Sequence, residues 1–152
     1  MATFDMFSSY CLSEPNSGSD AANMKTTAKL DGDDFVLNGS KVFISNARES
    51  DVFIVMCKTG PKEISTILVD KDTKGLSFGK IEEKMGWRSS PTSMVNFDDL
   101  RVPKRNLIFK QGEGFKIAMK ALDGGRINIA STSLGAATFA MEKTMDHLKT
   151  RK

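Results

Sequence analysis

Short apolar runs separated by turn signals fill the middle of this sequence and constrain its fold more than any other feature. Val52-Phe53-Ile54-Val55-Met56-Cys57 is a continuous apolar run, which is typical of a strand inside a sheet, and Gly60-Pro61 ends it. Similar runs lie at 26–30, 35–37, 41–45, 64–69, 75–78 and 93–97. Because no helical pattern separates these runs, they predict a mainly β fold, an antiparallel β-barrel or sandwich.

Two turn signals separate the runs at 26–30, 35–37 and 41–45 from one another. Asp31-Gly32-Asp33-Asp34 is a turn by composition, and Asn38-Gly39 is the strongest short hairpin signal in the sequence. The strand expected after this hairpin would place Lys41, Phe43 and Ser45 on one face, because side chains alternate along a strand. The sequence therefore predicts that Phe43 and Ser45 lie together.

From about Gly114 onward, apolar residues recur at the spacing of a helix. Residues 115–122 predict a short helix, which Gly124-Gly125 would stop. A longer helix is expected after it, because apolar residues recur every seven positions at Ile127, Leu134, Met141 and Leu148. This stripe predicts partner helices and hence a homo-oligomer that forms through the C-terminal helices. The alternative is that the helix folds back on the β domain.

The composition excludes several functional classes. The 152 residues contain 22 Lys and Arg and 19 Asp and Glu, and a net charge of +3 is too slight and too evenly mixed to indicate nucleic acid. No apolar run approaches the roughly 18 residues of a membrane helix, so no membrane insertion is expected. With one histidine and no clustered ligands, no metal site is expected either. Cys11 and Cys57 lie far apart, which favours buried thiols in a reducing compartment.

The segment from Tyr10 to Asp20 is the strongest candidate for a binding loop. Pro15 fixes one backbone angle, and Ser19 and Asp20 lie where a short helical turn could begin with exposed N–H groups. Hydroxyls and N–H donors of this kind suit a phosphate or the polar edge of a ring. The alternative is a surface turn with a capping serine.

Three blocks of the sequence resemble the acyl-CoA dehydrogenases. Tyr-Cys-Leu-Ser-Glu-Pro-Asn-Ser-Gly-Ser-Asp at 10–20 is similar to that family's flavin loop, Y-C-x-T-E-P-G-x-G-S-D, with Ser13 for threonine and Asn16 for glycine. Asn-Gly-Ser-Lys-Val-Phe-Ile-Ser-Asn at 38–46 is similar to its N-G-x-K-x-[WF]-I-[TS]-N block. Gly-Glu-Gly-Phe at 112–115 and Asp-Gly-Gly-Arg-Ile at 123–127 resemble the start of its C-terminal helical domain. Gly86-Trp87 and the residues 124–131 are most similar to the isobutyryl-CoA dehydrogenase branch.

This resemblance implies a domain organisation and a reaction. Residues 1–111 would form the family's middle β-barrel domain, and residues 112–152 the truncated start of its C-terminal helical domain. The family uses FAD to dehydrogenate an acyl-CoA thioester between its α and β carbons and passes the electrons to electron-transfer flavoprotein. A short, branched acyl group such as isobutyryl is the implied substrate. The family also implies the mitochondrial matrix in a eukaryote and the cytoplasm otherwise.

The resemblance assigns roles to individual residues. Ser13 and Ser45 would hydrogen-bond the reactive edge of the flavin, and Phe43 would cover the ring face. The remaining residues implied for the cofactor are Tyr10, Leu12, Ser19, Ile44 and Arg151, the last reaching the FAD of a neighbouring subunit. Those implied for the acyl-CoA are Ser19, Asp123, Gly124, Gly125 and Arg126.

Each assignment has an alternative that the sequence leaves open. Ser13 and Ser45 could be ordinary hydroxyls at strand ends, Phe43 could be core, and Arg126 could be a solvated residue. No residue of this chain is expected to be the catalytic base: the resemblance implies a glutamate beyond residue 152, and Gly125 stands where some relatives carry theirs. The sequence therefore predicts a dehydrogenase fragment without its base, or a non-catalytic flavin-binding, acyl-CoA-binding or assembly module derived from the family.

Overall fold

A computed structural model describes residue 3 and residues 5–152, which form two compact units, residues up to 117 and residues 118–152. The first unit is rich in β structure, and the second is helical. In chain order the elements are β1 (Ser8–Cys11), the 3-10 turn η1 (Ala21–Asn23), β2 (Thr27–Asp31), β3 (Asp34–Ser45), β4 (Val52–Lys58), β5 (Ile64–Asp70), β6 (Leu76–Ile81), β7 (Thr92–Pro103), the 3-10 turn η2 (Lys104–Asn106), β8 (Leu107–Ile108) and α1 (Gly114–Thr150).

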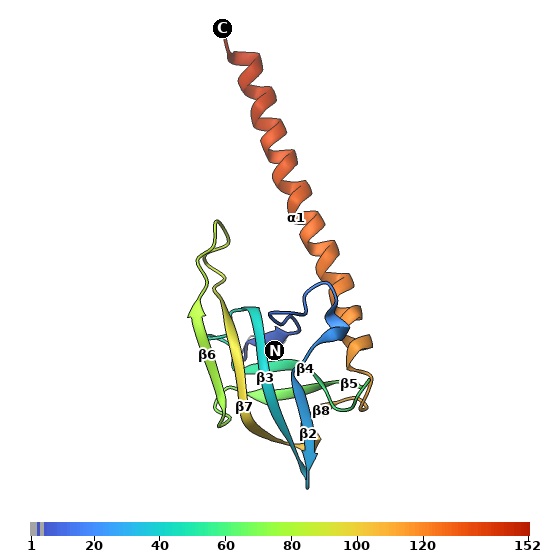
Figure 1. The fold of residues 1–152 in the computed structure, drawn as a ribbon. Helices are drawn as coiled ribbons and strands as arrows, with labels where there is room; N and C mark the ends of the chain where they lie inside the picture. The colour runs from blue at the N-terminus through green and yellow to red at the C-terminus, as the bar shows by residue number, and fades with distance from the viewer. Residues whose placement is uncertain (1–2, 4) are drawn as a thin grey trace. The chain divides into compact units, whose positions relative to one another are not determined.

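One eight-stranded sheet forms the first unit. Its order is β6-β7-β3-β2-β4-β5-β8, and β1 pairs in parallel with β4. Figure 1 shows β6, β7, β3 and β2 running side by side, with β4 and β5 crossing behind them. The prediction of a mainly β fold followed by a helical segment is confirmed, although within the described residues the sheet is open, with β6 and β8 at its two ends.

The core lies between these two groups of strands. Phe53 on β4 is fully buried, and its ring centroid lies 5.7 Å from that of Phe78 on β6. Val55 and Cys57 of β4 and Val95 of β7 are also fully buried in the same cluster. The continuous apolar run at 52–57 is therefore a strand inside the sheet, as predicted, because β4 is paired with β1, β2 and β5.

The hairpin predicted at Asn38-Gly39 is wrong, because β3 runs straight through these residues. The other predicted turn, at 31–34, is confirmed: Gly32, with a φ of 64°, lies between the antiparallel strands β2 and β3. Gly39 has a φ of 143° and marks a register shift between β3 and β7. A side chain at this position would collide with the neighbouring backbone, since a Cβ on Gly39 would lie 2.7 Å from the Cα of Thr26. The glycine thus serves a close approach inside the sheet.

A second register shift in β3 changes which side chains share a face. Lys41 pairs with Val95, and the next pair is Ile44 with Ser93, so β3 holds one extra residue between them. Phe43 takes up this bulge with a φ of 58° and is 70% exposed, whereas Lys41 and Ile44 are buried. The prediction that Lys41 shares a face with Phe43 is therefore wrong. Phe43 and Ser45 are both exposed, as expected from their shared face.

The C-terminal segment is one continuous helix of 37 residues, so the prediction of two helices is wrong. Gly124 and Gly125 lie inside it, because a glycine costs a helix only about 1 kcal/mol relative to alanine and does not stop it. The predicted stripe at Ile127, Leu134, Met141 and Leu148 is exposed in this chain, and Ile129 and Phe139 on other sides of the helix are exposed as well. Among the described residues, no helix has the length and apolar character needed to cross a membrane.

We expect both cysteine thiols to be inert in the folded protein. Cys11 and Cys57 are free and fully buried, and burial raises the pKa of each thiol to about 12. Because the thiolate is the reactive form, a thiol reagent at about pH 8 should label neither residue until the protein is unfolded, when both should react. Mass spectrometry after labelling with and without denaturant would check this result. Labelling of Cys11 alone under native conditions would indicate that β1 opens locally.

Candidate functional site

The first two motif blocks meet where β1 and the loop after it lie against the end of β3. The backbone N–H of Val42 donates a hydrogen bond of 2.9 Å to the carbonyl oxygen of Ser13. The hydroxyl of Ser9 donates to the carbonyl oxygen of Ser45 at 2.7 Å and lies 2.8 Å from the hydroxyl of Ser50. Residues about thirty positions apart in the sequence therefore form one continuous region of surface.

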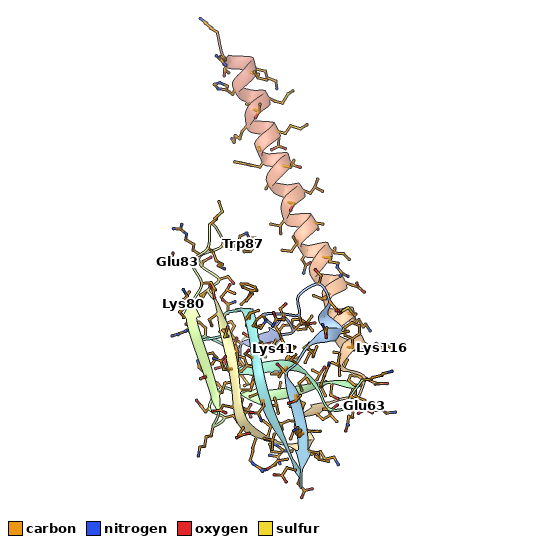
Figure 2. All side chains as sticks on the ribbon, viewed as in Figure 1. Lys41, Glu63, Lys80, Glu83, Trp87 and Lys116 are labelled. Carbon is orange, nitrogen blue, oxygen red and sulfur yellow. The ribbon has the colours of Figure 1, made fainter. Side chains whose placement is uncertain are left out.

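A buried ion pair joins the same two blocks from within. Lys41 Nζ lies 2.8 Å from Glu14 Oε1 and donates to the carbonyl oxygen of Leu12 at 2.9 Å. The carboxylate of Glu14 also accepts hydrogen bonds from the backbone N–H groups of Lys25 at 2.6 Å and Thr26 at 3.0 Å. The Lys41 side chain is completely buried and that of Glu14 is 6% exposed. Figure 2 places Lys41 inside the β-rich unit, among the strands.

The environment of this pair changes the pKa of both side chains. Burial alone would raise the pKa of Glu14, but its hydrogen bonds from Lys41, Thr26 and Lys25 together lower that pKa below the usual range. Burial lowers the pKa of Lys41, and the hydrogen bond and charge of Glu14 offset this effect in part. The sequence analysis gave no role to either residue. Both residues stand next to a serine in the sequence, so the local pattern gave no signal that they are buried.

The residues implied for the cofactor differ in what they present to the surface. Phe43 exposes its ring and Ser45 is exposed beside it, while Ser13 and Tyr10 are half-buried. The exposure of Phe43 excludes the alternative that it is a core residue. Burial raises the pKa of the Tyr10 hydroxyl to about 12.

Leu12 and Ile44 lie beneath this surface. Leu12 is 6% exposed and Ile44 is 2% exposed, so their side chains support the surface and do not form it. We call the exposed or half-buried groups Tyr10, Ser13, Phe43 and Ser45 the rim.

The loop at 82–91 lies next to the rim. The N–H of Asn46, directly after Ser45, donates to the carbonyl oxygen of Pro91 at 2.6 Å. The loop carries Met85 and Trp87, both of which are exposed, and Figure 2 shows Trp87 and Glu83 beyond the end of β6. In the sequence, Gly86-Trp87 of this loop indicated only a branch of the family, and nothing placed the loop beside Ser45.

The other half of the binding loop turns tightly and leads to a cationic cavity. Glu14 and Ser17 exchange backbone hydrogen bonds of 2.9 and 3.1 Å, and the predicted short helical turn after Ser19 is η1. Ser19 is exposed. Ala22, on η1, lines a cavity of about 320 Å³ together with Lys58, Lys62 and Phe115.

The residues implied for the acyl-CoA on the helix belong to the second unit. Asp123, Gly124, Gly125 and Arg126 are exposed on α1, and Arg126 Nη1 bonds Asp123 Oδ1 at 3.1 Å. Arg151 lies just after the helix and is exposed. Within the described part of the chain, no three His, Cys, Asp or Glu side chains gather in a way that could hold a metal ion.

Family comparisons agree with the motif blocks. The profile of the acyl-CoA dehydrogenase middle domain matches residues 9–100, and that of the acyl-CoA dehydrogenase C-terminal domain matches residues 112–152. This chain belongs to the acyl-CoA dehydrogenase family. It is 54% identical to the mitochondrial isobutyryl-CoA dehydrogenase of Dictyostelium discoideum over 100% of its own length and 38% of that relative. The chain thus spans less than half of this acyl-CoA dehydrogenase, and the resemblance inferred from the motifs is confirmed.

Solved structures show the same fold in other family members. A chain in the structure of the electron transferring flavoprotein of Acidaminococcus fermentans is 44% identical with a TM-score of 0.89, over 97% of this chain and 40% of that one. The acyl-CoA dehydrogenase of Bacillus anthracis, solved in complex with FAD, is 39% identical with a TM-score of 0.87, over 95% of this chain and 25% of that one. FAD is therefore the cofactor of the family to which this chain belongs.

Proposed function

We propose that this chain supplies the flavin-facing and thioester-facing part of an FAD-dependent acyl-CoA dehydrogenase. The substrate would be a short, branched acyl-CoA such as isobutyryl-CoA, which loses one hydrogen from each of its α and β carbons. The observation that carries this proposal is the exposed ring of Phe43, held on a bulge of β3 between Val42, which bonds the carbonyl oxygen of Ser13, and the exposed Ser45. In a soluble domain, an exposed aromatic ring with adjacent hydroxyls is suited to a flat ligand that has both an apolar face and a polar edge.

The chemistry of the rim fits the isoalloxazine ring of FAD. Phe43 would cover one face of that ring, and Ser13 and Ser45 would hydrogen-bond its polar edge. Tyr10 would line the same surface, with Leu12 and Ile44 supporting it from below. When bound, FAD would accept the β-hydrogen of the substrate as hydride.

The substrate side of the proposal rests on the polar loop and the helix. Ser19 would meet a phosphate of FAD or CoA, and Lys58 and Lys62 give the nearby cavity the positive charge that suits such a group. On α1, residues 123–126 would line the acyl-CoA cleft, with Arg126 near the CoA. Gly125 carries no side chain that could remove the α-proton, so we propose that the base is not among residues 1–152.

Two partners and a location complete this proposal. Arg151 would reach the FAD of a neighbouring subunit in a homo-oligomer that assembles through the C-terminal helices. Electron-transfer flavoprotein would take the electrons onward. In a eukaryote the site of action would be the mitochondrial matrix, as for the named relative from Dictyostelium.

A second candidate is a non-catalytic module that binds flavin or acyl-CoA or serves assembly. The exposed apolar side chains of α1, among them Leu134 and Met141, favour assembly through this helix. The two candidates differ in turnover. The chain alone should show no dehydrogenation of isobutyryl-CoA with an artificial electron acceptor, and turnover at stoichiometric enzyme concentration would place the base within residues 1–152.

Titration with FAD tests the flavin site directly. We expect saturable binding to the chain with a shifted absorbance and quenched fluorescence, and about tenfold weaker binding in Phe43→Ala, because one stacked aromatic ring is lost. Phe109→Ala is the matched control, since Phe109 is also exposed and also has a positive φ, 61°. Equal FAD affinity in the two variants would show that Phe43 does not contact the flavin.

A further inference from the structure

Ser13 of the rim is held on both sides by the buried ion pair. Lys41 Nζ bonds the carbonyl oxygen of Leu12 and the carboxylate of Glu14, the residues immediately before and after Ser13. The next residue of β3, Val42, donates its N–H to the carbonyl oxygen of Ser13. Three consecutive residues of the loop are thus fixed by two consecutive residues of the strand.

The same lysine stands at the start of the bulge that exposes Phe43. Lys41 is drawn inward to Glu14, and Ile44, at the other end of the bulge, is buried in the core. The extra residue between the two paired positions must therefore be accommodated at the surface. Phe43 is the residue that points outward, with its backbone at a φ of 58°.

Glu14 extends this network to a third segment. Its carboxylate accepts the N–H groups of Lys25 and Thr26, and Thr26 packs against Gly39 of β3. The ion pair consequently links the loop, the segment after η1 and the strand at one buried point. In the described structure, the Lys41 ammonium also contacts the sulfur of Met24 at 3.9 Å, so its three hydrogens all have partners.

A buried ion pair of this kind orients the backbone groups around it more than it stabilises the fold. Apolar side chains of similar volume stabilise a core about as well as a buried ion pair does, because the ions must lose their hydration. Hydrogen-bonded charges, unlike apolar side chains, also fix the orientation of the backbone carbonyl and N–H groups around them. The directional contacts here converge on the two segments that carry Ser13 and Phe43.

We propose that the Lys41–Glu14 pair is a positioning device that holds Ser13 and Phe43 in one fixed arrangement. Neither residue touches the ligand; both act through the rim. This inference rests on the proposed function, because flavin binding is what the arrangement would serve. How firmly the rim is held can nevertheless be measured without any flavin.

The test compares two charge-neutralising double variants of the full chain. Glu14→Gln with Lys41→Met removes the buried charges at nearly constant volume, and Asp31→Asn with Arg101→Met removes an exposed ion pair on β2 and β7. Amide hydrogen exchange by NMR and FAD titration are measured on both. In the first variant we expect cooperative unfolding and unchanged protection of β4 and β5, but at least about tenfold faster exchange of the Val42 N–H and about tenfold weaker, unquenched FAD binding. The second variant should behave as the unmodified chain.

Each outcome decides the inference. Unchanged protection of the Val42 N–H in the first variant would overturn it, whatever happens to FAD. If the unmodified chain binds no FAD, flavin binding by this chain alone is refuted, and the exchange of Val42 still decides the positioning role. If the double variant does not fold, Glu14→Gln alone is used, with faster exchange supporting the inference and unchanged exchange refuting it.

Discussion

Replacing Lys41 alone with methionine is expected to lower the free energy of unfolding by about 3–5 kcal/mol, because Glu14 would remain buried without its counter-charge. The carboxylate is 6% exposed and would keep only its two backbone donors, Lys25 and Thr26. Urea denaturation followed by circular dichroism measures this loss. Arg101→Met, which breaks the solvent-exposed ion pairs of Arg101 with Asp31 and Asp34, is the control and should change stability little.

The pH dependence of the free energy of unfolding provides a second test of the Lys41–Glu14 pair. The pKa of Glu14 is lowered in the folded state from its ordinary value of 4.5, so on acidification the unfolded chain takes up this proton first. The contribution of Glu14 is therefore complete above about pH 4.5 and is lost as the pH falls through the lower folded value. The Glu14→Gln variant should lack this pH-dependent loss of stability. For the lysine substitution, a Lys41→Met variant as stable as Arg101→Met would show that Glu14 is not paired in solution.

Much of the fold could be predicted from the sequence because its strands carry their own signals. The apolar run at 52–57 has the continuous pattern typical of a covered strand, and it is β4. Local turn and stop signals were less reliable, although the turn predicted at 31–34 does join β2 to β3. Asn38-Gly39 is favourable for a hairpin, yet pairing with β7 on one side and packing of Thr26 on the other keep it inside β3. Likewise, Gly124-Gly125 lowers helix propensity without ending α1.

The candidate site could be predicted only at its surface. Family motifs pointed to Ser13, Phe43 and Ser45, and the structure brings these residues to one region of the surface. The alternation rule placed Lys41 with them, and the bulge between Lys41 and Ile44 moves it inside. Composition arguments assign lysine and glutamate to solvent, so they could not find a pair whose partners come from two distant segments. Such pairs become visible only when the tertiary contacts are known.

Gly39→Ala is expected to be similarly damaging, lowering the free energy of unfolding by about 3 kcal/mol or more. The φ of 143° at this position is one that side-chain-bearing residues rarely adopt, and the added Cβ would lie 2.5 Å from Thr26 Oγ1 and 2.7 Å from Thr26 Cα. Because the second of these contacts is with backbone, no rotation of a side chain relieves it. The segment carrying Thr26, and with it the N–H that bonds Glu14, would have to move.

Gly32→Ala separates backbone strain from this collision. Gly32 also has a positive φ, 64°, but no atom lies within 4 Å of the position that its Cβ would take. Its substitution should cost only about 1 kcal/mol, the strain of a left-handed residue. Urea denaturation of the two variants gives the difference, and FAD titration shows whether the movement of Thr26 reaches the rim. Equal losses in the two variants would mean that β3 and the 24–26 segment are not closely packed in solution, and the anchoring of Glu14 through Thr26 would then have to be abandoned.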